Sequence, residues 1–342
     1  MSITYKDSGV DVEKTNSTVE TIKRIANITH RSDVSLISSI GGFSAAFEIP
    51  PSYTNPVIVA GIDGVGTKLR LALRLNTHAM IGYDLVGMCV NDILMCGAKP
   101  LAFLDYYASN NIVPRHLEKI IKSIAEACKN AGCVLVGGET AEIPNTYAGS
   151  NYELVGFAIG VVEKTGIITG EKIKSGDTLI SIPSTGLHSN GYSLINTLIS
   201  NGALDLEQKV PHWFQTTMGA GPVTLGEALM WPTRIYTSLI KTLLASANIH
   251  GMAHITGGGL IDNIPRMLPD ELTVDIQWDK IEFPTIFRTI QNAAEISREE
   301  MFKTFNCGIG AVVCVNKSDV DTVLGIIRAF DMLPNVIGHV TT

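Results

Sequence analysis

The chain has 342 residues, of which 45% are hydrophobic and 17% are charged, and its formal net charge at pH 7 is -7. These proportions are typical of a soluble globular protein, and the length predicts two domains because one hydrophobic core rarely serves so long a chain. The acidic balance argues against attraction to nucleic acid or to an anionic membrane, so we expect neither as a partner.

The N-terminal segment and the cysteines bear on the compartment. The segment MSITYKDSGVDVEK is polar and lacks the basic start and apolar core of a signal peptide. No stretch of sequence approaches the roughly 20 apolar residues of a membrane span. The six cysteines form no C-x-x-C pair and show no zinc-like spacing with histidine, which predicts reduced thiols. Together these features predict a cytoplasmic protein.

The first half of the chain predicts interleaved strands and helices. Residues 17–20 match a capping box ahead of a short helix. The apolar run 56–60 predicts a buried strand that ends in a glycine turn at Gly61. Apolar residues at helical spacing predict a helix over 82–96 that Gly97 stops. Further along we expect a strand at 101–104, a helix from Pro114 to Gly132, and strands at 133–136 and 152–162.

The second half begins after a polar, glycine-containing segment at 164–176. We place the domain boundary there, which gives an N-terminal domain of residues 1–165 and a C-terminal domain of residues 166–342. Both halves predict a mixed α/β or α+β architecture. Strands are expected at 178–182, 253–255, 272–276 and 308–315, around helical stretches.

The segment GIDGVGTK, residues 61–68, carries an acid and a lysine among its glycines. Its last three residues nearly invert the Gly-Lys-Thr order of a P-loop, so it is not a Walker A motif. A carboxylate at Asp63 would repel a phosphate unless a divalent cation stood between them, whereas Lys68 can meet a phosphate directly. This pattern indicates magnesium–nucleotide chemistry. The alternative is a tight turn in which Asp63 caps a main-chain amide.

Two further acids occupy comparable positions. Asp92 falls on the apolar stripe of the predicted helix 82–96, where a carboxylate is costly without a partner or a cation. A metal ligand would explain it, and a side chain at the helix flank in solvent is the alternative. Its neighbour Asn91 is equally ambiguous by itself. Glu139 in GGETAE follows a predicted strand, at the end where open α/β sheets collect ligands.

Two polar glycine loops mark the second half. Residues 184–193, STGLHSNGYS, predict an anion-binding or substrate-orienting loop, and a solvent loop with only local contacts of His188 is the alternative. Residues 256–263, TGGGLIDN, predict a glycine loop that opens a helix and holds a phosphate on main-chain amides, against a purely structural glycine cluster. The sequence contains no nucleophile elbow and no HExxH motif, so hydrolase and zinc-protease chemistry lack their parts.

Taken together these segments resemble the aminoimidazole ribonucleotide (AIR) synthetases, the phosphoribosylformylglycinamidine cyclo-ligase family. The resemblance spans essentially the whole chain. It implies a two-domain AIR-synthetase-like α/β fold whose N-terminal domain forms a dimeric β-barrel with its twin, so a homodimer is expected. The segments that carry it are YKDSGVD, GIDGVGTKLR, IGYDLVGMCVNDIL, FLDYYA, LVGGETAEIP, GLHSNGYSL, PTRIY, HITGGGLIDNIPR and FNCGIG.

The resemblance also implies an activity. ATP, with Mg²⁺ as cofactor, would drive ring closure of formylglycinamidine ribonucleotide (FGAM) to AIR, with release of ADP and phosphate. The amide oxygen would be phosphorylated, and the amidine nitrogen of the same substrate would then displace the phosphate. Such chemistry needs positioned reactants, neutralised phosphate charge and excluded water.

The site residues implied by the resemblance fall into three groups. The expected Mg²⁺ ligands are Asp63, Asp92, Glu139 and Asp262. The expected ATP-binding residues are Lys6, Gly41, Gly42, Gly64, Gly66, Thr67, Lys68 and Asn91. The expected substrate-binding residues are His188, Ser189, Asn190, Gly191, Thr256, Gly257, Gly258 and Gly259, and catalysis is expected to depend on His188, Asp63, Asp92 and Lys68.

Two alternatives remain at the level of sequence. The chain could be another ATP-dependent phosphorylating enzyme of the same superfamily, such as thiamine-monophosphate kinase, selenophosphate synthetase or formylglycinamidine ribonucleotide synthetase. It could also be a silent nucleotide-binding scaffold. The first cysteine is Cys89, which disfavours the selenophosphate enzyme because a reactive cysteine or selenocysteine is expected near its start.

Overall fold

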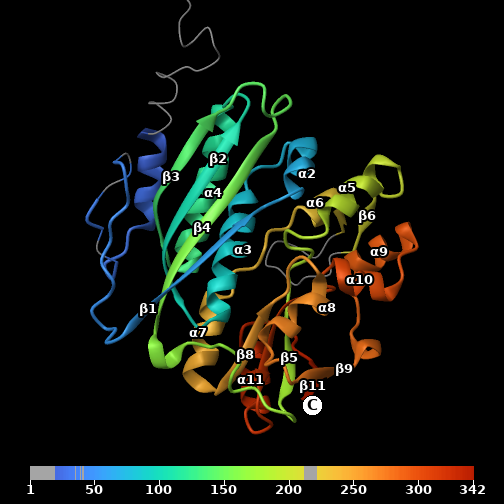
Figure 1. The fold of residues 1–342 in the computed structure, drawn as a ribbon. Helices are drawn as coiled ribbons and strands as arrows, with labels where there is room; N and C mark the ends of the chain where they lie inside the picture. The colour runs from blue at the N-terminus through green and yellow to red at the C-terminus, as the bar shows by residue number, and fades with distance from the viewer. Residues whose placement is uncertain (1–19, 35, 39, 41, 212–221) are drawn as a thin grey trace, which may run out of the picture. The chain divides into compact units, whose positions relative to one another are not determined.

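The computed structural model describes residues 20–34, 36–38, 40, 42–211 and 222–342. Its contacts divide the chain into two compact units, and Figure 1 shows that each is built on a sheet of its own. The first unit comprises Met1–Ile93 and Ala98–Thr165, and the second comprises Leu94–Gly97 and Gly166–Thr342. Within the described residues no helix combines the length and the apolar character needed to cross a membrane.

The first unit is organised around a four-stranded sheet. Its strand order is β1 (Pro56–Gly64), β4 (Tyr152–Glu163), β2 (Lys99–Ser109) and β3 (Val134–Glu142). The parallel pair β2 and β3 is joined by the helix α4 (Pro114–Ala131), which makes a βαβ unit, and the other two pairs are antiparallel. This connection brings the carboxyl ends of β2 and β3 to the same edge of the sheet.

Helices α3 (Ile81–Met95) and α4 cover one face of this sheet (Figure 1). Glycines let the layers approach closely. A side chain at Gly156 of β4 would begin 2.9 Å from the Cys89 sulfur of α3, and one at Gly82 would begin 2.2 Å from the main-chain nitrogen of Ile124 in α4. The interior of the first unit is therefore close-packed, and it fixes α3 relative to the sheet.

The predicted helix boundaries in this unit are confirmed. α3 and α4 both end where a glycine adopts a left-handed conformation, with φ of +79° at Gly97 and +71° at Gly132. Only glycine adopts this conformation without a steric penalty, which is why it stops helices so reliably. A helical segment at residues 20–26 continues into a 3-10 turn, Asn27–Thr29, and the predicted capping residues 17–19 lie outside the described residues.

The predicted turn at Gly61 is wrong, because β1 continues to Gly64. Gly61 pairs with Ala158 and Asp63 pairs with Gly156 in an unbroken antiparallel register with β4. A glycine inside a strand can mark a close approach of a neighbouring element rather than a turn. Here a side chain at Gly61 would begin 3.1 Å from Ile93 of α3. β3 likewise runs through its glycines, so Glu139 lies within a strand rather than after one.

The second unit contains an antiparallel five-stranded sheet. Its order is β8 (Ile249–His254), β10 (Ile309–Val315), β5 (Thr178–Pro183), β11 (Val336–Thr341) and β9 (Thr273–Ile276). The strands predicted in this half are all present. β5 and β8 are both antiparallel to β10, so they run in the same direction and their carboxyl ends lie at one edge. The two polar glycine loops of this half follow those two strand ends.

Helices surround this sheet, and α11 packs against α7 and β5 while α10 packs against α8. Two short strands pair as a separate ribbon. The remaining elements are α2 (Lys68–Leu75), η3 (Lys164–Gly166), α5 (Tyr192–Ser200), β6 (Lys209–Val210), β7 (Val223–Thr224), α6 (Leu225–Leu229), α7 (Thr237–Ser246), α8 (Gly259–Asn263), η4 (Pro265–Met267), η5 (Trp278–Lys280), α9 (Thr285–Ala294), α10 (Arg298–Thr304) and α11 (Val320–Ala329).

Candidate functional site

Two carboxylates of the first unit lie on neighbouring elements at α3. The Asp63 main-chain carbonyl accepts a hydrogen bond from the Cys89 thiol at 3.7 Å, and the Cβ of Asp92 lies 3.8 Å from where a Cβ would stand at Gly61. Burial raises the pKa of the Cys89 thiol, and the charges of Asp63 and Asp92 raise it further. Both acids therefore lie within electrostatic reach of the same buried sulfur.

The two carboxylates differ in their surroundings. Asp63 is half-buried, and one of its oxygens accepts a hydrogen bond of 2.7 Å from the main-chain N–H of Gly64. Asp92 is exposed, so its side chain is not the buried one that the helical stripe predicts, whereas Asn91 is fully buried. Mg²⁺ prefers oxygen ligands and is commonly held by one or two carboxylates together with water and phosphate oxygens. Asp63 and Asp92 fit that requirement.

Lys68 does not lie where a phosphate ligand would be expected. Its side chain is fully buried, and its ammonium donates a hydrogen bond of 2.9 Å to the equally buried carboxylate of Asp84 on α3. Burial lowers the pKa of Lys68, and the Asp84 charge opposes that shift. In this arrangement Lys68 joins α2 to α3 inside the first unit. The exposed Gly66, with φ of +66°, and the half-buried Thr67 lead into α2.

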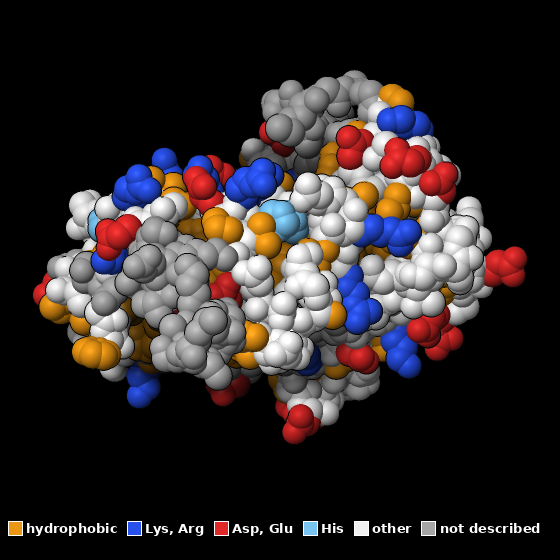
Figure 2. All heavy atoms as spheres, turned by 90° about the horizontal axis from the view of Figure 1, so that it is seen from above, with side chains coloured by type: hydrophobic (Ala, Val, Ile, Leu, Met, Phe, Trp, Pro, Cys, Tyr) orange, Lys and Arg blue, Asp and Glu red, His pale blue; other side chains and the backbone are white. Residues whose placement is uncertain are grey.

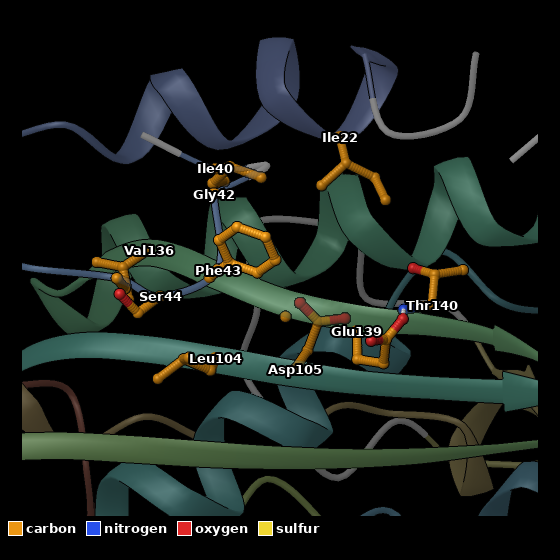
Figure 3. A pocket seen from close by; sticks show the side chains of 13 residues that line it. Ile22, Ile40, Gly42, Phe43, Ser44, Leu104, Asp105, Val136, Glu139 and Thr140 are labelled. Atoms are coloured by element: carbon orange, nitrogen blue, oxygen red, sulfur yellow. Dashed lines mark hydrogen bonds between the residues drawn. The ribbon is translucent and has the colours of Figure 1, made fainter. Parts of the chain in front are cut away.

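The first unit also contains a pocket of about 240 Å³, which is lined by Ile22, Ile40, residues 42–45 and residues of β2 and β3. Figure 3 shows its polar side chains, with Asp105 of β2 beside Glu139 and Thr140 of β3. Asp105 is only 7% exposed, and burial raises its pKa to about 7. Gly42 lines the same pocket, whereas Gly41 and Lys6 lie outside the described residues.

The distribution of acids limits the predicted metal set. Within the described ranges, no group of three or more His, Cys, Asp or Glu side chains is close enough to hold a metal ion together. Asp63, Asp92 and Glu139 belong to the first unit, and Asp262 belongs to the second.

Acidic and basic side chains are interspersed with apolar ones on the face shown in Figure 2.

In the second unit the loop after β5 is folded around His188. The imidazole is buried, and its Nε2 atom accepts hydrogen bonds from the main-chain N–H groups of Thr185 at 3.3 Å and Arg234 at 3.5 Å. An accepting Nε2 carries no proton, so this geometry favours the neutral ring with its proton on Nδ1. His188 itself has a left-handed backbone, with φ of +59°.

The segment PTRIY, residues 232–236, packs against this loop. The hydroxyl of Ser189 lies 3.1 Å from that of Thr233, and the Thr185 hydroxyl donates to the Pro232 carbonyl at 2.7 Å. Burial lowers the pKa of the Arg234 guanidinium, and the nearby Tyr236 opposes that shift. The loop around His188 is therefore held by a second loop that brings a half-buried cation to the same place.

The glycine loop at 256–259 meets the His188 loop. A side chain at Gly257 would begin 3.7 Å from the amide nitrogen of Asn190. The Asn263 amide group donates to the carbonyls of Thr256, Gly257 and Gly259, at 3.4, 3.0 and 2.8 Å, and thereby fixes the loop. Asn190 and the glycine loop thus border one polar region of the second unit.

Two predicted residues of this region have mainly packing contacts. A side chain at Gly191 would begin 2.3 Å from the Phe305 ring, so its glycine is required for close packing. The Asp262 carboxylate folds back over Gly258, where a side chain would begin 2.5 Å from one of its oxygens. Asn306 adds support from the segment FNCGIG, because its amide donates to the Gly186 carbonyl at 2.9 Å.

Several residues of these sites were not singled out from the sequence. Their motifs were recognised, but a motif does not say which of its members turns inward. Asp84 pairs with Lys68, Asp105 lines the pocket, and the polar region of the second unit includes Thr233 and Arg234. The signal that could have identified such residues is a polar side chain inside an otherwise apolar strand or helix, as in FLDYYA.

The fold and the sites define a two-domain mixed α/β protein that presents carboxylates in one unit and main-chain amides in the other. Residues 45–162 match the N-terminal domain of AIR synthase related proteins, and residues 174–342 match the C-terminal domain of the same proteins. The chain therefore belongs to the family of AIR synthase related proteins. The predicted fold class is confirmed.

Solved structures share this fold at low sequence identity. Thiamine-monophosphate kinase from Stenotrophomonas maltophilia K279a is 17% identical over 93% of this chain and 92% of its own, with a TM-score of 0.65. Hydrogenase maturation protein HypE in complex with ATP is 15% identical over 98% and 88%, with a TM-score of 0.65. T. maritima PurL complexed with AMPPCP is 14% identical over 94% and 44%, with a TM-score of 0.54.

Proposed function

We propose that the protein is an ATP-dependent cyclo-ligase that converts FGAM to AIR with release of ADP and phosphate. The observation that carries the proposal is the contact between the GLHSNGYSL and TGGG loops, at Asn190 and Gly257. It creates a preformed polar region of main-chain amides and hydroxyls suited to a phosphorylated, amide-bearing substrate.

Nucleotide use is supported by the family and by its solved relatives. One of the similar structures is a complex with ATP and another a complex with AMPPCP. In this chain, Asp63 and Asp92 would hold Mg²⁺, with Glu139 as a further candidate. Bound there, Mg²⁺ would neutralise phosphate charge and orient the triphosphate. The main-chain amide of Gly66 follows Asp63 closely in the chain and is a candidate for a phosphate contact, whereas the amide of Gly64 donates to the Asp63 carboxylate and would have to exchange that bond for one to a phosphate.

The chain's own groups would act chiefly by positioning. The amide oxygen of FGAM is a poor leaving group until it is phosphorylated, and the amidine nitrogen must then reach the activated carbon. Asn190, Ser189 and the amides of 257–259 would fix the substrate so that these two atoms meet. The neutral His188, with Nε2 engaged by two main-chain N–H groups, would hold the substrate-binding loop in place.

An exposed apolar face supports the proposed homodimer. Ile62 of β1 and Phe157 of β4 stand directly opposite one another in the sheet, and they are 65% and 37% exposed. Ile58 and Tyr106 share this face. Apolar side chains gathered on one face mark an interaction surface. We expect the protein to sediment as a dimer, and Ile62→Glu should shift it toward the monomer.

A direct assay tests the reaction. Purified protein is incubated with FGAM, ATP and Mg²⁺, and AIR is detected by diazo coupling, with thiamine monophosphate offered in parallel. AIR formation that requires both ATP and Mg²⁺ is expected. ADP formation only with thiamine monophosphate would make the protein a kinase of the same fold, and nucleotide binding without any turnover would indicate a scaffold.

A further inference from the structure

Two motifs of the second unit end in residues to which the proposed function gives no role. Tyr236 closes the segment PTRIY, and Gly310 closes FNCGIG at the start of β10. The Tyr236 side chain is buried, and its hydroxyl donates a hydrogen bond of 2.9 Å to the carbonyl of Pro183 at the end of β5. Burial raises the pKa of this hydroxyl, and the charge of Arg234 opposes that shift, so the hydroxyl keeps its proton and remains a donor.

Gly310 leaves open the space in which the tyrosine hydroxyl lies. A side chain at Gly310 would begin 1.9 Å from the Tyr236 hydroxyl oxygen and 2.8 Å from Cε1 of His188. The φ angle of Gly310 is not among the positive ones, so space and not backbone conformation requires a glycine here. The hydroxyl and the edge of the imidazole therefore meet over the backbone of this one residue.

The position of Gly310 is fixed by the sheet. Gly310 is the extra residue of a β-bulge, because Ile309 and Ala311 pair with consecutive residues of β5. The Gly310 carbonyl accepts a hydrogen bond of 3.0 Å from the main-chain N–H of Ile255, the residue after β8. The bulge is thus tied to both neighbouring strands, and it holds Gly310 in place relative to the loops that follow them.

The neighbouring hydroxyl bears on which way the His188 ring is turned. Nε2 accepts hydrogen bonds from the main-chain N–H groups of Thr185 and Arg234, and Cε1 lies beside the point that the Tyr236 hydroxyl occupies. Rotation of the ring by half a turn exchanges these two ring atoms. It would put carbon against the two N–H groups and an unprotonated nitrogen against the hydroxyl oxygen, whose proton is directed to the Pro183 carbonyl. Both changes disfavour the rotated ring.

We propose that Tyr236 and Gly310 are positioning residues, which together hold the His188 imidazole in one orientation with its proton on Nδ1. Nε2, occupied by two N–H donors, is then not available as a base, so His188 serves turnover by organising its loop before the substrate arrives. The effect on turnover rests on the proposed function, whereas the orientation of the ring does not.

Nitrogen NMR tests the orientation without any substrate. Protein labelled with ¹⁵N-histidine gives the shifts of both ring nitrogens, and those of His188 are assigned by their absence from His188→Gln. In the wild type we expect a protonated Nδ1 and an unprotonated Nε2 at neutral pH. In Tyr236→Phe and Gly310→Ala the two shifts are expected to move toward each other, because the ring then exchanges between tautomers and orientations. Unchanged shifts in Tyr236→Phe, the milder variant, would overturn the proposal.

A double variant tests whether the two residues act at one point. Tyr236→Phe removes the hydroxyl that Gly310→Ala would strike, and the nearest remaining atom of that ring lies 3.0 Å from the new Cβ. Gly310→Ala is expected to lower kcat for AIR formation about 100-fold, as for a misplacement of about 1 Å, and the double variant to recover at least about tenfold of that loss. The calorimetric affinity for ATP should hold in each. Losses in kcat that simply add would contradict a shared point of action.

Tyr152→Phe is the matched control in the first unit. It removes an equally buried hydroxyl, which lies 3.0 Å from Nδ1 of His78. The His78 shifts are expected to change, while the His188 shifts and kcat stay as in the wild type. His188 shifts that respond to this variant as much as to Tyr236→Phe would overturn the proposal, because they would report any loss of a buried hydroxyl.

The outcomes separate the positioning role from the proposed function. AIR formation by the wild type, with unaltered His188 shifts and kcat in Tyr236→Phe, would remove the positioning role and leave the cyclo-ligase intact. Lower stability of Tyr236→Phe with unaltered His188 shifts would make the tyrosine a purely structural residue, which also removes it. Altered His188 shifts in a protein that forms no AIR would support the positioning of His188 and reject the cyclo-ligase.

Discussion

Replacing Lys68 by Met tests whether this residue stabilises the fold or binds phosphate. Met keeps the length of the side chain and removes its charge, so the buried Asp84 carboxylate loses a partner 2.9 Å away. At that distance the gross attraction is about 6 kcal/mol at an effective dielectric constant of 20. Desolvation of both charges offsets much of it. Removing one member of a buried pair nevertheless costs about 3–5 kcal/mol, because the remaining charge stays buried.

Urea unfolding followed by circular dichroism measures this effect. We expect Lys68→Met to lower the free energy of unfolding by about 3–5 kcal/mol, and the double variant Lys68→Met/Asp84→Asn to recover most of that loss, since no buried charge remains. Arg70→Met, at an exposed position of the same helix, is the matched control and should change it by less than about 0.5 kcal/mol.

The same variants distinguish the two roles of Lys68. If the lysine serves the fold, the double variant should bind ATP nearly as the wild type does once its stability has returned. A Lys68→Met protein that is as stable as the wild type but has lost ATP affinity would refute the structural role. It would show that the ammonium leaves Asp84 and meets a phosphate.

Three other predictions concern single side chains. Asp63→Asn should lower turnover by about 100-fold or more with unchanged unfolding, because it removes charge from the proposed metal site at constant size; near-normal activity at saturating Mg²⁺ would exclude that role. His188→Ala should lower kcat/KM for FGAM by more than about tenfold while the calorimetric affinity for ATP holds, and equal losses would assign His188 to the nucleotide. Burial, with the charges of His116 and Lys119, lowers the pKa of His78 from 6.5 to about 4. The unfolded chain therefore binds the extra proton, so the free energy of unfolding should fall by up to about 3 kcal/mol as pH drops from 6.5 to 4. Urea unfolding measured at several pH values should show a weaker dependence of the unfolding free energy on pH for His78→Gln than for the wild type. An unchanged pH dependence would contradict the assignment.

Much of the fold follows from local sequence signals. The helices that end at Gly97 and Gly132 were predicted to within about one residue, because an apolar stripe followed by a left-handed glycine is determined by short-range sterics. The strand β1 was predicted too short. Its continuation through Gly61 depends on packing against α3 and on pairing with β4, which lies about 90 residues further along the chain. No local pattern reports such a contact.

The sites were predictable in composition but not in arrangement. Asp63, Asp92 and Asn190 were recognised through their motifs. The burial of Lys68 was not, because an ammonium two residues after a glycine suggests a phosphate contact until Asp84 is known to face it. Asp105 was overlooked for the opposite reason. Within FLDYYA it looks like an ordinary polar residue of a strand, and only the register with Gly138 shows that the carboxyl stays open to a pocket.

The two units present chemically opposite surfaces, and this contrast constrains any substrate. The first unit offers the carboxylates of Asp63, Asp92 and Glu139, which attract cations and amino groups. The second offers main-chain amides at 256–259 and the guanidinium of Arg234, which attract anions. The proposed reaction needs a site for a metal-bound nucleotide and a site for a phosphorylated acceptor, whereas a simple nucleotide scaffold needs only the first. If Arg234→Met leaves ATP affinity intact but weakens FGAM binding, the anion-binding role of the second unit is supported. Unchanged binding of FGAM would show that the Arg234 guanidinium has a purely structural role.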